Sequence, residues 1–471
     1  MTPSARRRVA SNTAIQIAGK GIVLLFGLAS LAVLTRYLGP DDYGKYTLAL
    51  MYMQLFGVLA DVGLFTTVVR EISKDRSRTD ELVGNVLTLR LLLAFVVIAV
   101  ASAVSLLLPY EHDVRVAIVL AGAPLLFGMV TTSYVAILQS RLQMSRAVLG
   151  DVIGRATSLL LVLVVASLDL GFYAVMLAAG GGALATLIVT WLVTRGLAAI
   201  RFRANLAVWR PMLVSALPLG LALAINQLYF RADTLIISLY EPYDQVGLYT
   251  LAYRILELAL VAGYIFVNTA FPLLSQAVEH DEPRALRMIQ VSTDVLVILG
   301  VPFLAGGLVL APAVVQLASG DDFSGAVEPL RILLAAGALA WVNGVFGLAL
   351  IAKNRQMSAL WLNVVALVFN VGLNLLLIPR YGIVVAAIIT VASEVLILGG
   401  SYVLMRRYFN FFPIPRTLPP AIVAAAVMAG LLWLARDAPV VITAPLGALV
   451  YVALLWWISP TSREVFTGLR S

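Results

Sequence analysis

Residues 91–108 read LLLAFVVIAVASAVSLLL, eighteen residues without one charged side chain. A run of this length matches the ~20 apolar residues that a helix needs to cross the ~30 Å hydrocarbon core of a bilayer. Comparable runs recur along the chain, in which 61% of the 471 residues are hydrophobic and only 12% are charged. Soluble domains carry about 25% charged residues. The sequence therefore predicts an all-α integral membrane protein with many spans.

The rest of the composition argues against several kinds of site. The chain has no Cys, which excludes disulfides and thiolate metal ligands, and only His112 and His280, both in loop-like stretches. A net charge of +8 would suggest nucleic acid in a soluble protein, but in a membrane protein it reflects Lys and Arg in cytoplasmic loops. No GxxxxGK[ST] motif is present. We expect no metal, no cofactor, no ATPase activity and no nucleic-acid partner.

Breaks at charged, Gly and Pro clusters divide the chain into fourteen expected spans. These are 12–37, 43–69, 84–108, 114–139, 149–167, 171–194, 211–239, 246–275, 290–310, 326–352, 357–378, 382–405, 418–435 and 439–458. The first is longer than the ~7–15 apolar residues of a signal peptide, so we expect it to remain uncleaved. We expect an N-lobe (1–200), a C-lobe (201–410) and a C-terminal helix pair (411–471).

The distribution of Lys and Arg predicts the orientation. Of 33 such residues, six lie deeper inside the spans, and the other 27 lie in loops or within two residues of a span end. With the N-terminus in the cytoplasm, 22 of these lie on the cytoplasmic side and five on the other, namely Arg36, Lys45, Arg115, Arg380 and Arg436. The asymmetry predicts a multi-pass protein of the cytoplasmic membrane with both termini in the cytoplasm.

One phrase occurs twice. Residues 37–49 read YLGPDDYGKYTLA and residues 239–252 read LYEPYDQVGLYTLA, each at an expected extracytoplasmic turn. Six spans separate the copies, an even number, so the two halves are predicted to be parallel repeats about an axis along the membrane normal. We interpret the phrase as a corner in which Pro ends one helix and Gly44 or Gly247 permits the turn.

Several charges fall within the expected spans, where each costs roughly 2.5–3.5 kcal/mol at a helix centre and therefore tends to face an internal cavity. Arg254 lies about two turns into its span, with Glu257 on the same face at i+3. With Lys20 and Arg231 it would form a cationic wall suited to phosphate or pyrophosphate.

Other polar residues complete the candidate set. Asn226 and Arg90 are further cavity candidates, while Asp61, Asp233 and Glu257 are either charge partners or ion-coupling groups. The alternatives are that Arg90 snorkels or packs, and that Arg254 and Glu257 form a self-contained ion pair.

Acidic pairs in the loops raise an enzymatic alternative. Polytopic glycosyltransferases place such residues outside the membrane, and Asp41 and Asp42 lie in the first expected outer loop. The second copy of the phrase has no acidic pair in register, and Asp321 and Asp322 read as a solvated turn. We therefore expect no catalytic residues.

The sequence resembles the polysaccharide-biosynthesis (Wzx-type) flippases of the multidrug/oligosaccharidyl-lipid/polysaccharide (MOP) exporter superfamily. The resemblance covers roughly residues 10–410. It rests on Asn12 with Lys20, TRYLGPDDYGKY (35–46), ADVGLFTTVVREIS (60–73), RADTLIISLYEPYDQVGLYTLAYRI (231–255) and FPLLSQ (271–276). AYRILEL (252–258) also resembles a segment of the lipid II flippases, whose arginine there lines the cavity, a role that carries over to Arg254. Clear equivalents of the cavity arginines in the first two helices of those flippases are lacking, which argues against lipid II as cargo.

The resemblance implies a monomeric flippase that moves a polyprenyl-(pyro)phosphate-linked oligosaccharide to the outer leaflet by alternating access. An ion gradient or the membrane potential would drive it, and glycosyltransferases and a polymerase of the same pathway would be its partners. An ion-coupled multidrug/cation antiporter of the same superfamily is the alternative, although residues 12–37 lack the Asp that such exporters often carry in the first helix. An integral-membrane glycan polymerase is a third possibility, disfavoured because no large outer loop is expected.

Overall fold

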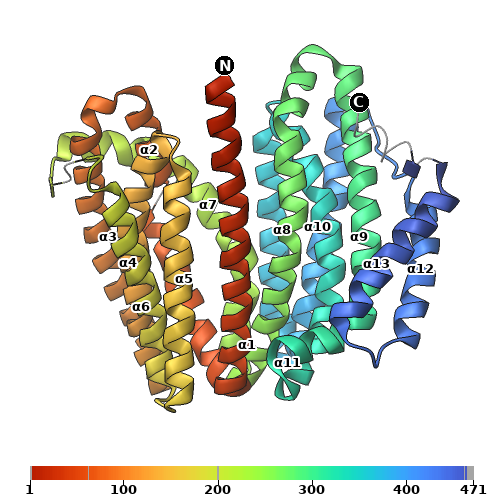
Figure 1. Ribbon diagram of the computed structural model, residues 1–471, viewed down its shortest axis with the longest axis horizontal. Coiled ribbons are helices and arrows are strands. Elements are labelled where there is room, and N and C mark those ends of the chain that lie inside the picture. Colours follow the sequence, from red (N-terminus) through yellow and green to blue (C-terminus); the bar gives the residue numbers. More distant parts are fainter. Residues whose placement is uncertain (1–2, 62, 199–200, 461, 464–471) are drawn as a thin grey trace. The chain divides into compact units, whose positions relative to one another are not determined.

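The computed structural model describes residues 3–61, 63–198, 201–460 and 462–463 (Figure 1). It divides into two compact units, Met1–Gly247 and Leu248–Ser471. All regular structure in the described ranges is helical, which confirms the predicted all-α class. The boundaries expected for the N-lobe, the C-lobe and the C-terminal helix pair stay a prediction.

Unit 1 is a helical bundle. Its elements are α1 (Pro3–Asp61), α2 (Leu64–Lys74), η1 (Arg76–Arg78), α3 (Thr79–Leu107), α4 (His112–Ser140), α5 (Met144–Ser167), α6 (Phe172–Thr194) and α7 (Leu206–Tyr240), followed by the first turn of α8. α4 packs on α3 and α6, and α7 packs on α1, α2 and α3.

Unit 2 contains the rest of α8 (Tyr243–His280). It continues with α9 (Glu282–Ser319), η2 (Asp321–Ala326), α10 (Val327–Ala352), α11 (Gln356–Phe409), α12 (Leu418–Leu434) and α13 (Val440–Ile458). α10 packs between α9 and α11, and α12 packs on α9.

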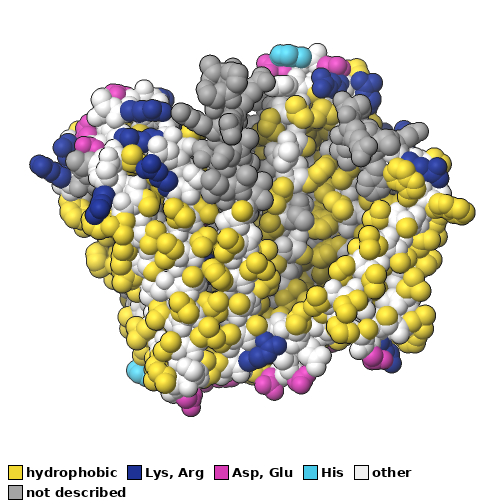
Figure 2. All heavy atoms as spheres, viewed as in Figure 1, with side chains coloured by type: hydrophobic (Ala, Val, Ile, Leu, Met, Phe, Trp, Pro, Cys, Tyr) yellow, Lys and Arg dark blue, Asp and Glu magenta, His cyan; other side chains and the backbone are white. Residues whose placement is uncertain are grey.

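Ten helices of the described chain are long and apolar enough to cross a membrane. Two of these long helices bend at a glycine with positive φ, α1 at Gly39 and α11 at Gly382, so each supplies two of the predicted spans. On the face shown in Figure 2, hydrophobic side chains cover the middle of the helices and charged side chains gather at their ends. Large apolar residues such as Leu92, Phe95 and Val96 of α3 are exposed, as expected for surfaces that contact lipid.

One predicted span is interrupted. The sequence predicts a continuous helix over 43–69, but α1 ends at Asp61 and α2 begins at Leu64. Gly63 between them has a φ of 75°, in the left-handed region that breaks an α-helix and that glycine tolerates without strain. The break leaves Asp61 at the end of a helix, where its carboxylate can turn toward the neighbouring α3.

The duplicated phrase forms a corner in both copies, but its glycines act differently from the prediction. Gly39, with a φ of 67°, makes the first bend, while Gly44 and Gly247 lie within helices. A Cβ at Gly44 would lie 1.8 Å from the carbonyl oxygen of Tyr243, and one at Gly247 would lie 2.1 Å from that of Pro40. The prediction that Gly44 or Gly247 permits the turn is therefore wrong: these glycines allow the two corners to touch at the backbone.

Side chains around this corner are held by polar contacts. The ammonium of Lys45 lies 2.7 Å from Asp41 and 3.7 Å from Glu111, and the N–H of Glu111 donates to the hydroxyl of Tyr243 at 3.1 Å. Between α7 and α8, burial raises the pKa of Glu241, and the nearby carboxylate of Asp244 adds to the effect. Asp41, considered above as part of an acidic pair, is thus an ion-pair partner of Lys45.

The hydrophilic segment at the opposite end of unit 1 follows α2. The carboxylate of Asp75 accepts from the N–H and the hydroxyl of Ser77, at 3.0 and 2.6 Å, and these hydrogen bonds lower its pKa. Lys74 and then Arg70 hold the pKa of Glu71 below its usual value. These short-range contacts give the connection a defined shape outside the membrane-spanning helices.

A buried carboxylate fastens α12 to α9 in unit 2. Asp294 accepts from the N–H of Thr417 at 3.1 Å and from its hydroxyl at 3.0 Å, and also from the amide of Gln290 at 2.8 Å. Thr417 is the residue before α12, so the negative charge lies at the positive end of the α12 dipole. Apolar residues of α9, α12 and α13 pack below it.

Asp294→Ala should loosen this attachment. Leaving the Thr417 donors unsatisfied costs about 1–3 kcal/mol, and every 1.4 kcal/mol raises the population of an opened linker about tenfold. Tryptic cleavage after the exposed Arg416, measured on the full chain in detergent, should accelerate by roughly that factor. Asp437→Ala, at an exposed carboxylate, is the control and should leave the rate unchanged. Equal rates in both variants would contradict the role of Asp294.

Candidate functional site

The structure brings two of the candidate residues in unit 1 into direct contact. Arg90 of α3 is fully buried, and its guanidinium donates to the carboxylate of Asp61 at the end of α1. The other arm donates to the hydroxyls of Thr132 and Ser133 of α4, both at 3.1 Å. Arg90 thus joins three helices inside unit 1 through a charge pair and two hydroxyls.

This pair has the features of a buried, hydrogen-bonded ion pair. The side chain of Asp61 remains 33% exposed, so the carboxylate keeps access from one side while the guanidinium does not. Attraction between the charges offsets the desolvation of each, but loss of either partner leaves a buried charge uncompensated. Such an arrangement can hold α1, α3 and α4 in one fixed packing.

The candidates on α7 lie near its end at the corner. Asp233 is buried, Arg231 is partly buried, and the carboxylate of Asp233 accepts from the N–H of Thr234 at 2.7 Å. Arg231 lies nine residues before the end of α7 at Tyr240, roughly 14 Å along the helix. The side chain of Asn226 lies outside the described residues.

Lys20 is exposed on the first arm of α1, which packs against α5. Asp151 of α5 lies within electrostatic range of both Lys20 and Arg155. Lys20 therefore belongs to a mixed-charge group on α1 and α5.

The candidate pair in unit 2 is present as the i, i+3 spacing predicts. A guanidinium nitrogen of Arg254 lies 3.0 Å from a carboxylate oxygen of Glu257. The side chains are 46% and 25% exposed, so neither charge is enclosed by the helices of its own unit. Arg254 lies eleven residues after the start of α8, roughly 16 Å along a helix that must cross a ~30 Å hydrocarbon core. Arg254 is therefore an exposed cation well inside a helix that is long and apolar enough to span a membrane.

Unit 2 also contains a polar cluster around Glu394, one of the charges within the expected spans, whose uncharged members the sequence does not predict. The amide of Asn343 of α10 donates to the carboxylate of Glu394 of α11 at 2.7 Å. On α11, Asn370 donates to Ser393 at 3.2 Å, and Asn374 donates to Asn370 at 2.9 Å. The cluster ties both arms of α11 together and one of them to α10. The i, i+4 spacing of Asn370 and Asn374 in an otherwise apolar span was the available signal.

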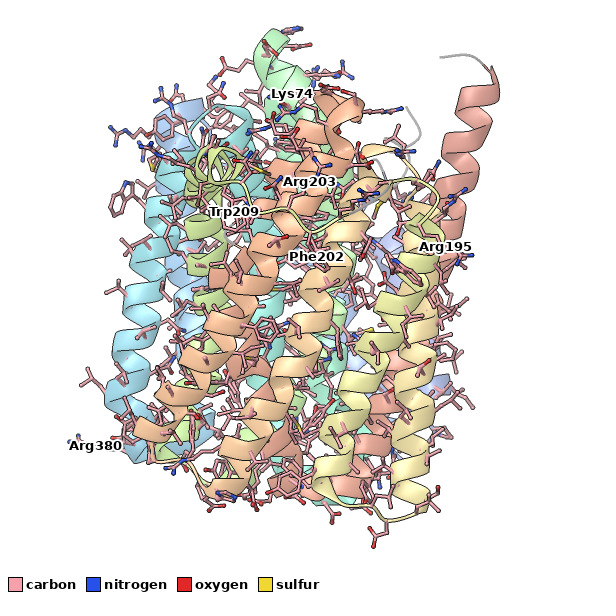
Figure 3. All side chains as sticks on the ribbon, turned by 90° about the vertical axis from the view of Figure 1, so that its left-hand side faces the viewer. Lys74, Arg195, Phe202, Arg203, Trp209 and Arg380 are labelled. Atoms are coloured by element: carbon pink, nitrogen blue, oxygen red, sulfur yellow. The ribbon has the colours of Figure 1, made fainter. Side chains whose placement is uncertain are left out.

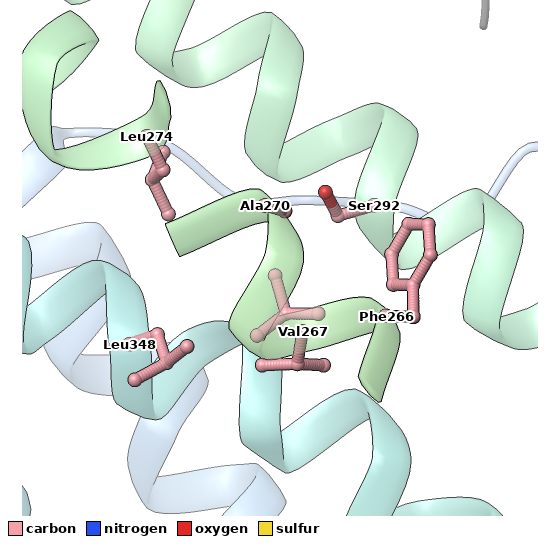
Figure 4. Close-up of a pocket in the computed structure, with 7 residues that line it drawn as sticks. Phe266, Val267, Ala270, Leu274, Ser292 and Leu348 are labelled. Atoms are coloured by element: carbon pink, nitrogen blue, oxygen red, sulfur yellow. The ribbon is translucent and has the colours of Figure 1, made fainter. Parts of the chain in front are cut away.

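A pocket in unit 2 has the opposite chemistry. It lies among α8, α9 and α10, and its lining includes Phe266, Val267, Leu274 and Leu348, with Ser292 as its polar residue (Figure 4). Such a lining favours hydrocarbon over a charged headgroup. It does not include any of the candidate residues.

Comparison with known proteins gives relatives of part of the chain. It is 30% identical over 166 residues to a probable low-salt glycan biosynthesis flippase, Agl15, of Haloferax volcanii, covering 35% of each chain. It is 26% identical over 260 residues to a probable flippase, AglR, of the same organism, covering 52% of this chain and 53% of the relative. The alignments therefore span about a third and about half of these relatives.

Solved structures match over nearly the whole length. The lipid II flippase MurJ in an inward closed conformation has a TM-score of 0.77 at 12% identity, covering 94% of this chain and 98% of its own. An inward-facing multidrug resistance MATE transporter of the MOP superfamily has a TM-score of 0.64 at 18% identity, covering 82% of this chain and 94% of its own. At these identities the likeness shows a shared fold.

The family model of the polysaccharide biosynthesis proteins matches residues 9–278, which is more than half of the 471 residues. The match includes both copies of the corner and all of the candidate residues. The resemblance drawn from the sequence is confirmed by this match and by the MOP-type fold. The chain belongs to the polysaccharide biosynthesis protein family.

Proposed function

We propose that this protein is a flippase that moves a polyprenyl-(pyro)phosphate-linked oligosaccharide from the cytoplasmic to the outer leaflet of the cell membrane. The observation that carries the proposal is Arg254, a half-exposed guanidinium roughly 16 Å along a helix that is long and apolar enough to span a membrane. A cation at this depth is costly against lipid and therefore serves a polar pathway. Family membership and the flippase names of the relatives support the same reading.

The chemistry of the cation favours a phosphate-bearing cargo. A guanidinium binds two phosphate oxygens at once, whereas an ammonium acts as a point charge. Glu257 would hold the guanidinium of Arg254 in position until a headgroup phosphate takes the place of the Glu257 carboxylate. Lys20 and Arg231 would supply further positive charge. Asp61, Asp233 and Glu257 would either hold the cationic side chains in place or couple transport to an ion gradient.

Transport would proceed by alternating access of two lobes, driven by an ion gradient or by the membrane potential, which supplies about 2.3 kcal/mol per charge per 100 mV. The protein would act as a monomer that receives its cargo from glycosyltransferases and delivers it to a polymerase. A deletion strain tests this function directly. Loss of a surface glycan, restored by the unaltered chain, is the expected result, whereas drug sensitivity with an intact glycan would favour the antiporter.

The proposed topology makes a separate prediction. The native chain has no Cys, so Asp42→Cys in the outer corner and Ser77→Cys in the 70–81 segment can each be labelled alone. A membrane-impermeant maleimide should label Asp42→Cys in intact cells and Ser77→Cys only after permeabilisation. Both positions are solvent-accessible, so each serves as the control for the other. The reverse pattern would overturn the orientation.

A further inference from the structure

The connection from α6 to α7 forms a strap, defined here as residues 201–210. Residues 201–205 have no regular secondary structure, and Leu206–Arg210 form the first turns of α7. Figure 3 shows Phe202, Arg203 and Trp209 of the strap at the same end of unit 1 as Lys74 and Arg195. This is the basic end of the bundle.

The underside of the strap is fixed to α3. The N–H of Asn205 donates to the side-chain oxygen of Asn85 at 2.9 Å, and the indole of Trp209 donates to the carbonyl of Asn85 at 3.1 Å. The N–H of Arg203 donates to the hydroxyl of Thr88 at 3.1 Å. A Cβ at Gly84 would lie 2.2 Å from the carbonyl oxygen of Arg201, so only glycine allows this approach. The backbone is thereby held against the helix ends, and the outward side chains are presented in one arrangement.

The outer face of the strap alternates cations with large apolar groups. Phe202 is 71% exposed and Leu206 is 76% exposed, and both lie between exposed arginines at 201, 203 and 210. In the described part of the chain, no acidic side chain forms an ion pair with these three arginines. A surface of this composition exposes apolar area to water beside positive charge that no carboxylate of the described chain balances.

The apolar part of this face continues the lipid-facing surface of the helices. Along α7 the next exposed apolar residues are Val214 and Leu217, and α6 ends with exposed Trp191 and Leu192. The strap therefore lies where the apolar surface of the bundle meets the basic end. Basic residues interleaved with aromatic and aliphatic side chains are typical of segments that lie in the headgroup region of an anionic leaflet.

We propose that the strap is a docking site for anionic phospholipids of the bilayer, with Phe202 and Leu206 inserted among the upper acyl chains and Arg201, Arg203 and Arg210 bound to headgroup phosphates. The strap thereby fixes the level of α3 and α7 in the membrane. This role is independent of which cargo the protein moves.

The test places a reporter between the arginines. The full chain carrying Ala204→Cys, its sole Cys, is labelled with bimane and reconstituted in vesicles of phosphatidylcholine with a minor, constant fraction of phosphatidylglycerol. In one preparation the phosphatidylglycerol is brominated, and in the other an equal amount of the phosphatidylcholine is brominated. The two preparations therefore have the same lipid charge, and they differ only in which lipid carries the bromine that quenches the label.

Quenching per brominated molecule should be about fivefold stronger for phosphatidylglycerol, because each arginine at a membrane surface favours an anionic lipid by roughly this factor. The preference should fall markedly with Arg201→Gln, Arg203→Gln, which removes the two arginines nearest the label and leaves Arg210. It should persist with Arg201→Lys, Arg203→Lys. High NaCl should also reduce the preference of the unaltered arginines. Phe202→Ser should weaken quenching by both lipids.

Arg36→Gln, Arg115→Gln removes the same charge from the opposite end of unit 1 and should leave the preference intact. Equal quenching by both lipids with the native arginines would overturn the proposal, as would a preference that survives the Gln variants. A label that neither lipid quenches but that responds to an acidic peptide would also overturn it, in favour of a protein partner. If the Gln variants fail to fold, the salt response of the native strap decides, since a salt-insensitive preference contradicts arginine–phosphate binding.

Discussion

Arg254→Ala is expected to abolish transport while leaving the protein inserted and folded. The headgroup phosphate would lose its hydrogen bonds to the guanidinium. Losing hydrogen bonds to a charged group costs about 1.5–3 kcal/mol, which corresponds to roughly tenfold to a hundredfold in the affinity for an anionic headgroup. Arg254→Lys should also be poor, because an ammonium cannot bind two phosphate oxygens in the planar geometry of a guanidinium. Lys20→Ala and Arg231→Ala should have smaller effects, since each removes one charge among several.

Complementation of a glycan-export defect, with variants matched for membrane level, measures this effect. Arg436→Ala, at an arginine stacked on Trp433 in the α12–α13 connection, is the control and should remain active. The double variant Arg254→Ala, Glu257→Ala separates the two roles of the pair. A purely structural pair should regain activity when both charges are gone, whereas a cargo-binding arginine should not. Full activity of Arg254→Ala, Arg231→Ala would place the cargo pathway elsewhere.

Arg90→Ala should produce the largest loss of stability in unit 1, about 3–5 kcal/mol. The substitution leaves the carboxylate of Asp61 without its cation and opens a void where a large side chain was fully buried. The melting temperature of the purified chain in detergent should fall by roughly 6 °C or more. Asp61→Asn should cost less, because an amide oxygen still accepts from the guanidinium and the site is partly exposed.

The double variant Arg90→Met, Asp61→Asn provides the matched comparison. Replacing a buried ion pair by uncharged groups of similar volume is often neutral, so this variant should be more stable than Arg90→Ala. The transport activity of the double variant then reports whether Asp61 acts as a coupling group or only as a partner for Arg90. An unchanged melting temperature for Arg90→Ala would show that the pair does not hold α1, α3 and α4 together.

Most of the helical layout was accessible from the sequence, because hydrocarbon thickness sets the length of each apolar run. Each of the fourteen predicted spans corresponds to a helix or a helix arm in the described ranges. The break at Gly63 was not predicted, since a single glycine in an apolar run is also common within membrane helices. Gly44 and Gly247 were assigned to a turn because glycine usually marks one, while their actual role depends on a backbone contact between residues two hundred positions apart.

The sequence predicted contacts of the candidate site where both residues lie on the same helix. Arg254 and Glu257 share a helix face, so their spacing alone predicts the ion pair that is present. Arg90 and Asp61 lie on different helices, and only the packing of α1 against α3 and α4 reveals that they pair. The strap is beyond sequence reasoning for the same reason, since its shape depends on hydrogen bonds to Asn85 and Thr88. The functions of all these residues stay proposals for the experiments above.

The touching corners have the form of an isologous interface folded into a single polypeptide. Gly44 faces the backbone of the second copy near Tyr243, and Gly247 faces that of the first near Pro40, so each copy supplies the same kind of surface to the other. Two identical chains related by a two-fold axis make contacts of this kind. Because both halves are encoded in one chain, a bulkier residue at either glycine forces apart a contact that its counterpart cannot restore. A side chain at either position would therefore disrupt the same backbone contact.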